Sequence, residues 1–178
     1  DRDGVAKRLV ERVGQTVLTC PTTACFNGLD AEDTVDVGGQ LRRILGDEPA
    51  GVARAGELLA RAVAPLRPEG RPLYAGLASL GLPGEPLADA WRLADMLREY
   101  RGDAHVSAWT AAGFDATEIG LLTEPYWGLP LRTYVRTRAW TDAQLDAAAA
   151  RLVERGLLQD GGLTPEGRTE REEVEVAT

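Results

Sequence analysis

The chain of 178 residues is long enough for one domain, or two small ones, with a hydrophobic core. Its formal net charge of −8 argues against nonspecific binding to nucleic acid, because such binding needs a basic surface that neutralises phosphates. No apolar run approaches the roughly 18 to 20 residues that span a bilayer, and the first residues lack the apolar stretch of a secretion signal, so we expect a cytoplasmic protein without a membrane partner.

The N-terminal segment predicts one helix and then an ambiguous stretch. Apolar side chains recur at helical spacing over residues 2–13, whereas residues 14–33 combine a short extended pattern with turn residues. Cys20 and Cys25 lie in this stretch. They are interpreted as free structural thiols, with a redox pair as the alternative. Two thiols without a nearby histidine are too few for a zinc site, so no metal is expected.

The middle of the chain predicts three helices separated by Gly and Pro. Residues 35–46 and 49–66 give two helical patterns, and "RPEGRP" at 67–72 breaks the chain. In the second pattern the side chains expected to face inward are Leu58, Leu59, Ala62 and Val63. A longer helix is expected over residues 87–112, where Gly113 supplies a C-terminal stop signal.

The C-terminal part predicts three helices, a hairpin and a final helix. Helices are expected over residues 115–126, 131–139 and 141–158, with an acidic cap on the first and Thr141 as the cap of the third. Asp160, Gly161 and Gly162 indicate a hairpin turn, and residues 165–176 a last acidic helix. The expected fold is therefore mainly α. A helical region over 1–112 would pack on a winged helix-turn-helix with a small β-wing over 113–178.

Residues 115–175 resemble the MarR-type regulators. The resemblance rests on "RLVERGLLQDGGLTPEGRTEREE", in which Leu-x-x-x-Gly-Leu ends the recognition helix and Leu-Thr-Pro-Glu-Gly begins the helix after the wing. It implies a winged helix and, in a regulator, DNA binding as a dimer. Arg132, Arg136 and Arg138 are the candidate DNA-binding residues under that interpretation.

The predicted DNA-reading surface has the wrong charge for that role. A recognition helix needs polar or basic side chains at its N-terminal end, but this one begins "TDAQLDAAAA". Asp142 and Asp146 share one helical face, and the wing turn carries Asp160. Pairing of the three arginines with Asp142, Asp146 or Glu124 is therefore the alternative to operator binding, and the sequence favours structural use of the winged helix.

Three phrases between residues 69 and 158 resemble a family of actinobacterial helix-turn-helix-domain proteins whose biochemical role is not established. They are "EGRPLYAGLASL", "LADMLREYRGDAHVSAWTAAGFDATE" and "RTRAWTDAQLDAAAARLVERGLL". The dominance of arginine, with Lys7 as the only lysine, is typical of such GC-rich genomes. Ala139 stands where that family usually has glycine, and the family usually carries a longer helical N-terminal half.

The helix expected over 87–112 carries an unusual stripe. At about 100° per residue, six side chains fall within a sector roughly 80° wide. The stripe interleaves two indoles with an acid, a base, a glycine and the only histidine of the chain: Trp91, Asp95, Arg98, Gly102, His105 and Trp109. A second face is expected to turn to the core, with Leu93, Leu97 and Tyr100. A third sector is expected to be solvated: Asp89, Arg92, Glu99 and Asp103.

The stripe predicts a ligand pocket, with an ordinary helix seam as the alternative. Arg98 presents a planar fork that suits a carboxylate, sulfate or phosphate, between the flat walls of Trp91 and Trp109. His105 and Asp95 are the candidate catalytic residues, His105 as a proton-transfer group and Asp95 as an acid that holds a partner's charge or orients a neighbouring group. In the seam alternative, Asp95 and Arg98 form a helical ion pair and the indoles pack between helices.

The sequence thus leaves three classes of function open. The favoured one is a protein that binds a small, anionic molecule, or a biosynthetic enzyme, with the winged helix as scaffold. The alternatives are a MarR-like regulator that binds DNA as a dimer and an interaction protein whose aromatic seam docks a partner chain. Tyr126, Trp127 and Tyr134 are expected to form the joint between the helical part and the winged part, with the far wall of the pocket as the alternative. No nucleophile elbow, phosphate-binding loop or dinucleotide fingerprint occurs, so no cofactor is expected and no reaction is named.

Overall fold

The computed structural model describes residues 39, 41–47 and 49–178. The chain divides into two compact units, Asp1–Asp103 and Ala104–Thr178. The helix expected over 2–13, the segment 14–33 and both cysteines lie outside the described residues. The division into functional regions at residue 112 stays a prediction. None of the helices in the described part combines the length and apolar character that crossing a bilayer requires.

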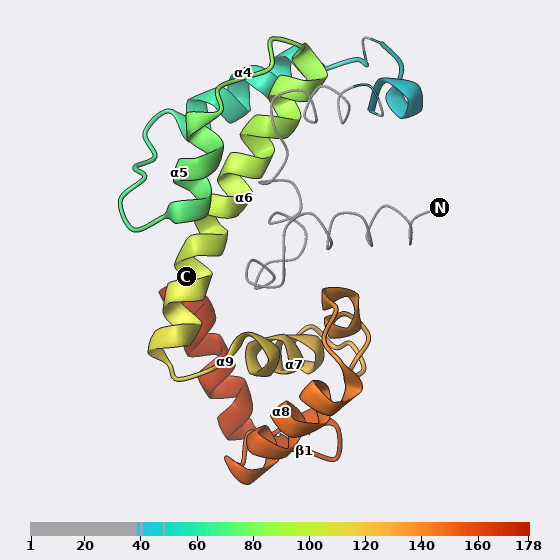
Figure 1. Cartoon of the computed structure of the whole chain (residues 1–178), viewed down its shortest axis with the longest axis vertical. Helices are drawn as coiled ribbons and strands as arrows, with labels where there is room; N and C mark the ends of the chain where they lie inside the picture. The colour runs from blue at the N-terminus through green and yellow to red at the C-terminus, as the bar shows by residue number, and fades with distance from the viewer. Residues whose placement is uncertain (1–38, 40, 48) are drawn as a thin grey trace. The chain divides into compact units, whose positions relative to one another are not determined.

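The elements that the structure describes in the first unit are all helices. Residues 41–45 are helical, and α4 (Val52–Val63), α5 (Pro72–Ser79) and the first part of α6 (Pro86–Ala111) follow (Figure 1). Their core consists of Val63, Tyr74, Leu77, Leu93 and Met96, with Leu97 and Tyr100 packed against it. Of the side chains predicted to face inward from α4, Val63 is buried, whereas Leu58 is exposed and its prediction was wrong.

Helix α5 was not expected from the sequence pattern. Pro72 occupies its first turn, but Arg71 at the N-cap position provides no side-chain cap. The carboxylate of Asp103 on α6 supplies it instead, accepting hydrogen bonds from the backbone N–H groups of Leu73 at 3.3 Å and Tyr74 at 3.0 Å. Because that cap comes from a distant part of the chain, the residues next to α5 contain no capping side chain that would predict where this helix begins.

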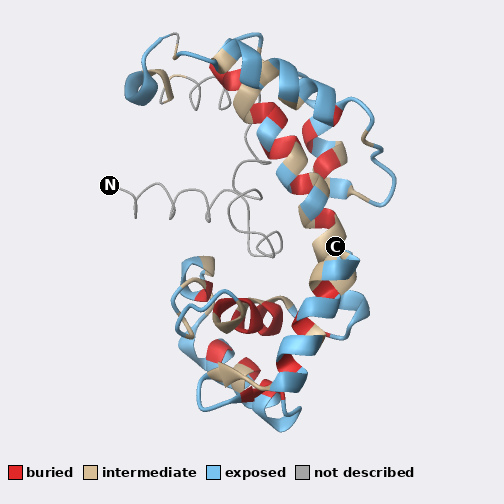
Figure 2. Cartoon of the chain, turned by 180° about the vertical axis from the view of Figure 1, so that it is seen from behind, coloured by how far each residue is buried: buried red, intermediate tan, exposed pale blue. Residues whose placement is uncertain are grey.

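The second unit has the element order of a winged helix. After the end of α6 come α7 (Ala116–Tyr126), the 3-10 helix η2 (Val135–Arg138), α8 (Asp142–Glu154), β1 (Leu158–Gln159), β2 (Gly162–Leu163) and α9 (Pro165–Ala177) (Figure 1). Most residues of α7 are buried, as Figure 2 shows, and it forms the centre of the unit. The predicted fold class, mainly α with a small β-wing, is confirmed.

Two helices of this unit begin at the caps that the sequence predicts, and in the structure each cap is part of a capping box. Asp115 accepts from the N–H groups of Thr117 and Glu118, and Glu118 accepts in return from the N–H of Asp115. Thr141 and Gln144 make the same reciprocal pair at the start of α8. Each box satisfies otherwise unpaired donors of a first helical turn.

The wing is a minimal hairpin with a close contact behind it. Leu158 pairs with Leu163 and Gln159 with Gly162, across a turn in which Asp160 and Gly161 both have positive φ. Behind the wing, a Cβ placed on Gly167 of α9 would lie 2.0 Å from the carbonyl oxygen of Leu157. Only glycine allows α9 to approach the end of the recognition helix this closely.

The segment between α7 and α8 departs from the predicted helix over 131–139. Only Val135–Arg138 is helical, as a single 3-10 turn. The fully buried carboxylate of Glu124 accepts from the backbone N–H groups of Tyr134 and Val135, each at 2.7 Å, and of Arg132 at 2.6 Å. Arg132 has a φ of 64°. Because Glu124 binds these amides, the chain turns where the local pattern would continue as a helix.

Candidate functional site

The predicted stripe on α6 contains one compact ionic cluster in the first unit. Nε and Nη2 of Arg98 donate to Oδ1 of Asp95 at 3.0 and 2.7 Å, and Nη2 lies 3.1 Å from Oε1 of Glu99. The side chain of Arg98 is 40% exposed, whereas those of Asp95 and Glu99 are 8% and 1% exposed. The two acids thus lie inside and the guanidinium reaches the surface. We call these three residues the α6 cluster.

Burial shifts the pKa values of Asp95 in the α6 cluster and of the nearby Arg92. Desolvation raises the pKa of Asp95 above its usual value, and this effect exceeds the opposing attraction of Arg98 and Arg92. The pKa of Arg92 is lowered, again because burial disfavours its charged form. Burial thus disfavours the charged forms of a carboxyl and a guanidinium that lie three residues apart on α6.

The α6 cluster fixes the direction of the Arg98 side chain. Two of its nitrogen atoms are held by acids, and Nη1 makes no hydrogen bond to any residue in the described part of the chain. A guanidinium held on one edge by buried acids loses little further freedom when its other edge binds a ligand. The arrangement can therefore donate hydrogen bonds to an oxyanion at the surface.

The sector of α6 that we expected to be solvated is in fact mostly buried. Arg92, Glu99 and Asp103 are all buried, so that prediction was wrong. Arg92 donates to the carbonyl of Gly81 at 3.2 Å, and Asp103 caps α5. Polar side chains at helical spacing look like a surface face in the sequence, but partners on distant segments make their burial possible.

Gly102, the glycine of the stripe, lies next to the side chain of Glu99. A Cβ placed on Gly102 would lie 3.4 Å from Oε2 of Glu99, within ordinary van der Waals contact but directly over the carboxylate. The sequence suggested that this glycine marks close approach by a backbone or a ligand. In the described residues the nearest group is instead the side chain of Glu99 one turn earlier.

The other predicted members of the stripe lie in the second unit. Nδ1 of His105 is 3.0 Å from Oγ1 of Thr178. That hydroxyl donates its one hydrogen to the carbonyl of Val174 at 2.7 Å, so Nδ1 of His105 must be the donor. Trp109 packs against the core of the second unit. A wall shared by these residues with Trp91 and Arg98 stays a prediction.

The predicted DNA-binding arginines are held within the second unit. Arg132 donates to Asp146, and Nη2 of Arg136 lies 3.7 Å from Oδ1 of Asp142. The guanidinium of Arg138 lies over the ring of Tyr134, 4.4 Å from its centroid. Both acids are on α8 and are strongly exposed, Asp142 at 79% and Asp146 at 64%. The pairing that we gave as the alternative to operator contacts is thus present.

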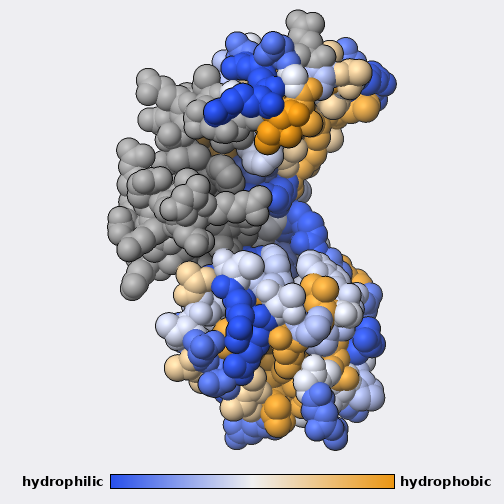
Figure 3. All heavy atoms as spheres, turned by 90° about the vertical axis from the view of Figure 1, so that its right-hand side faces the viewer, coloured by the Kyte–Doolittle hydropathy of each residue, from blue (hydrophilic) through white to orange (hydrophobic). Residues whose placement is uncertain are grey.

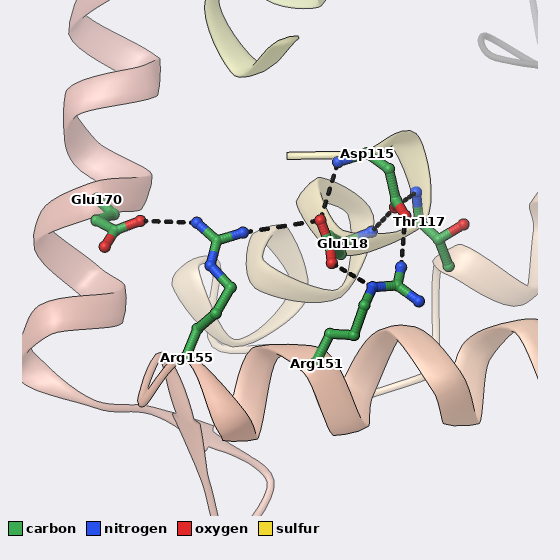
Figure 4. A network of polar contacts seen from close by, with 6 residues as sticks. All are labelled: Asp115, Thr117, Glu118, Arg151, Arg155 and Glu170. Atoms are coloured by element: carbon green, nitrogen blue, oxygen red, sulfur yellow. Dashed lines mark hydrogen bonds and ion pairs between the residues drawn. The ribbon is translucent and has the colours of Figure 1, made fainter. Parts of the chain in front are cut away.

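A second ionic network fixes α8 and α9 to α7. Glu118 of α7 is buried, accepts from Nε of Arg151 at 2.7 Å and lies 3.8 Å from Nη1 of Arg155 (Figure 4). Arg151 also pairs with Asp115, and Arg155 with Glu170 at 3.3 Å. The buried carboxylate of Glu118 thus binds α8 to α7 through Arg151 and Arg155, and Arg155 in turn contacts Glu170 of α9. This network stabilises the architecture of the winged helix.

Apolar side chains are also exposed on the second unit. Trp127 and Leu129 follow α7, and the Trp127 ring lies 6.3 Å from the ring of Tyr134. The sequence assigned Tyr126, Trp127 and Tyr134 to a joint or a pocket wall. Tyr126 instead donates to Glu172 of α9, which raises the pKa of its hydroxyl. Figure 3 shows hydrophobic and hydrophilic residues interspersed on the visible side of this unit.

Sequence reasoning missed Glu99, Glu124 and Asp103 as the carboxylates that organise the two units. Each lies near apolar residues at helical spacing and reads as a surface acid. The described residues contain no group of three or more His, Cys, Asp or Glu side chains that could hold a metal ion.

Short segments of this chain are similar to formyltransferases. Over 40 residues it is 45% identical to one component of the formyltransferase/hydrolase complex of Methylorubrum extorquens, covering 22% of this chain and 13% of that protein. Formylmethanofuran–tetrahydromethanopterin formyltransferases are 52% identical over 42 residues in Archaeoglobus fulgidus and 60% identical over 37 residues in Methanococcoides burtonii. These matches cover 23% and 20% of this chain, and 14% and 12% of those proteins.

The chain therefore spans only about one eighth of the length of these curated relatives. No solved structure matches it. A family match, in contrast, extends over residues 5–178 and is to a helix-turn-helix family. It includes both the α6 cluster and the whole winged helix, so the chain belongs to this helix-turn-helix family.

Proposed function

We propose that this chain binds a small molecule with an oxyanion at Arg98 and uses its winged helix as a scaffold. The observation that carries the proposal is the α6 cluster, in which two buried acids hold a half-exposed guanidinium through its Nε and Nη2 atoms. Arg98 would bind a carboxylate, sulfonate or phosphate, and Trp91, which lies two turns earlier on α6, would offer an apolar wall.

The proposal extends to the remaining residues of the stripe. Trp109 would be a second wall, and His105 would exchange a proton with the ligand if the protein is an enzyme. His105 is the group proposed for this transfer because an imidazole exchanges protons near neutral pH, and its Nδ1 lies 3.0 Å from Oγ1 of Thr178. Asp95 serves as the residue that positions Arg98. The protein is proposed to work in the cytoplasm, without a cofactor.

Ligand titration tests the proposal. Benzoate, benzenesulfonate and phenyl phosphate should quench tryptophan fluorescence of the chain at concentrations where the neutral analogue benzamide has no effect. Arg98→Gln should weaken the bound oxyanion at least tenfold, since it removes a charged hydrogen bond worth about 1.5–3 kcal/mol. Arg67→Gln is the matched control, because Arg67 is exposed and lies 3.9 Å from Glu69. Equal binding by Arg98→Gln, or no binding of any of the three anions, would contradict the proposal.

A ligand-responsive regulator of the MarR type is the second candidate. It is favoured by the complete order of helix, recognition helix, wing and last helix in the second unit and by the family match. In that case a dimer would bind operator DNA through α8, with Arg132, Arg136 and Arg138 on the phosphates. Sequence-specific binding of the DNA upstream of the gene at physiological salt, lost in Arg132→Ala, would establish this candidate over the first.

A further inference from the structure

The face of α8 lacks the side chains that read DNA. Between Asp142 and Ala150 the exposed positions hold only acids, alanines and Gln144, and Gln144 is used in the capping box with Thr141. The buried positions Leu145, Ala148 and Leu152 fix which side of the helix packs inward. No arginine, lysine or asparagine on this face can therefore reach a base edge.

Two acids on the same face occupy the arginines that would contact phosphates. Asp146 binds Arg132, whose backbone is itself held in place by Glu124. Asp142, in the first turn of α8, lies 3.7 Å from Arg136. The first turn of a helix favours a negative charge, and in a winged helix bound to DNA that charge belongs to a phosphate.

We propose that Asp142 and Asp146 are internal phosphate mimics that mask a latent nucleic-acid surface formed by Arg132 and Arg136. The acids hold the two guanidinium groups at the edge of α8 and at the same time repel the backbone of a duplex. The surface fits the sugar-phosphate backbone of double-stranded DNA, without sequence preference. This inference is independent of ligand binding at Arg98, and neither depends on the other.

The masking is replaceable because both ion pairs are exposed. Pairs between solvated side chains contribute little stability, so neutralising the acids should free the arginines without disturbing the fold. Each phosphate that a protein neutralises contributes about 0.9 to the slope of log K against log salt concentration. Two released arginines should therefore make that slope steeper by about 2.

The test measures binding of the full 178-residue chain to a fluorescent, random-sequence DNA duplex between 50 and 200 mM salt. The double variant Asp142→Asn/Asp146→Asn should bind about tenfold more tightly than the original chain at the lower salt concentration, with the steeper slope. Adding Arg132→Gln and Arg136→Gln to it should abolish the gain. Unchanged thermal unfolding midpoints show that the variants are folded.

The matched control is Glu57→Gln/Glu69→Gln. It removes the same charge and releases two exposed arginines of the first unit, Arg54 and Arg67. Little change in DNA binding by this control, together with loss of the gain in the quadruple variant, supports the proposal. Three results would overturn it: no gain in the double variant, an equal gain in the control, or a gain that persists without Arg132 and Arg136.

Discussion

The α6 cluster and the face of α8 both pair arginine with acids, but they differ in how far the acids are buried. In the α6 cluster the acids are inside and Arg98 is half-exposed, whereas on α8 the acids Asp142 and Asp146 are more exposed than the arginines that they bind. A buried acid must keep its partner, while an exposed acid can exchange its partner for water or phosphate. The burial of the acid thus decides whether an ion pair is permanent.

Glu124 is the extreme case of a buried acid and should show the largest effect. Glu124→Ala leaves the N–H groups of Arg132, Tyr134 and Val135 without acceptors in the interior, so we expect the free energy of unfolding to fall by about 3 kcal/mol or more. Urea denaturation measures the loss. Hydrogen exchange of those three amides should become faster, and unchanged exchange would show that Glu124 does not hold the turn.

Asp103 should come next, because it caps a helix from a distance. Asp103→Ala removes the acceptor of the Leu73 and Tyr74 amides and should cost about 1–2 kcal/mol, as for an N-cap. The effect should be read by urea denaturation and by loss of helical circular dichroism. Asp47→Ala, an exposed acid of the same unit, is the control and should change little. A loss equal to that of the control would mean that α5 does not need its cap.

Asp95 should have a smaller effect at neutral pH, with a characteristic pH dependence. Asp95→Asn replaces a buried carboxylate whose charged form is disfavoured by burial, and its partner Arg98 can be hydrated, so we expect the free energy of unfolding to change by no more than about 1 kcal/mol at neutral pH. Since burial raises the pKa of Asp95, the folded state takes up a proton more readily than the unfolded chain. The stability of the original chain relative to Asp95→Asn should therefore increase as the pH falls from 7 toward 4. A difference that shrinks over that range would indicate a lowered pKa.

Asp146 should show the smallest effect on stability. Asp146→Asn removes an exposed pair with Arg132, and the free energy of unfolding should change by less than about 1 kcal/mol. Measured beside Asp95→Asn under the same conditions, this variant completes the comparison. A loss larger than that of Asp95→Asn would reverse the relation between burial and permanence that we infer.

Features with local signals were predictable from the sequence. The long helix, expected over 87–112, spans Pro86–Ala111, because its Gly stop and turn lie next to it in the chain. The Thr141 cap and the hairpin at Asp160 and Gly161 were predicted for the same reason. In each case the residues that determine the element are within a few positions of it.

Features that depend on distant partners were not predictable. α5 begins under a cap supplied by Asp103, and η2 is shortened by Glu124. Arg92, Glu99 and Asp103 share one side of α6 and look solvated, since a sequence does not show which acids find buried partners. Of the candidate site, the proximity of Asp95 and Arg98 was predictable from their spacing, whereas the contribution of Glu99 was not.

The contact at Gly167 explains one part of the sequence by the packing of the second unit and not by its activity. A methyl group at this position would overlap the carbonyl of Leu157, so the last residue of the Leu-Thr-Pro-Glu-Gly phrase must be glycine for α9 to pack this closely against the end of α8. Selection for that joint preserves the phrase whether or not the protein ever touches an operator. A search by this motif would therefore retrieve repressors and non-repressors alike, and the charge of the neighbouring helix is the feature that sorts them.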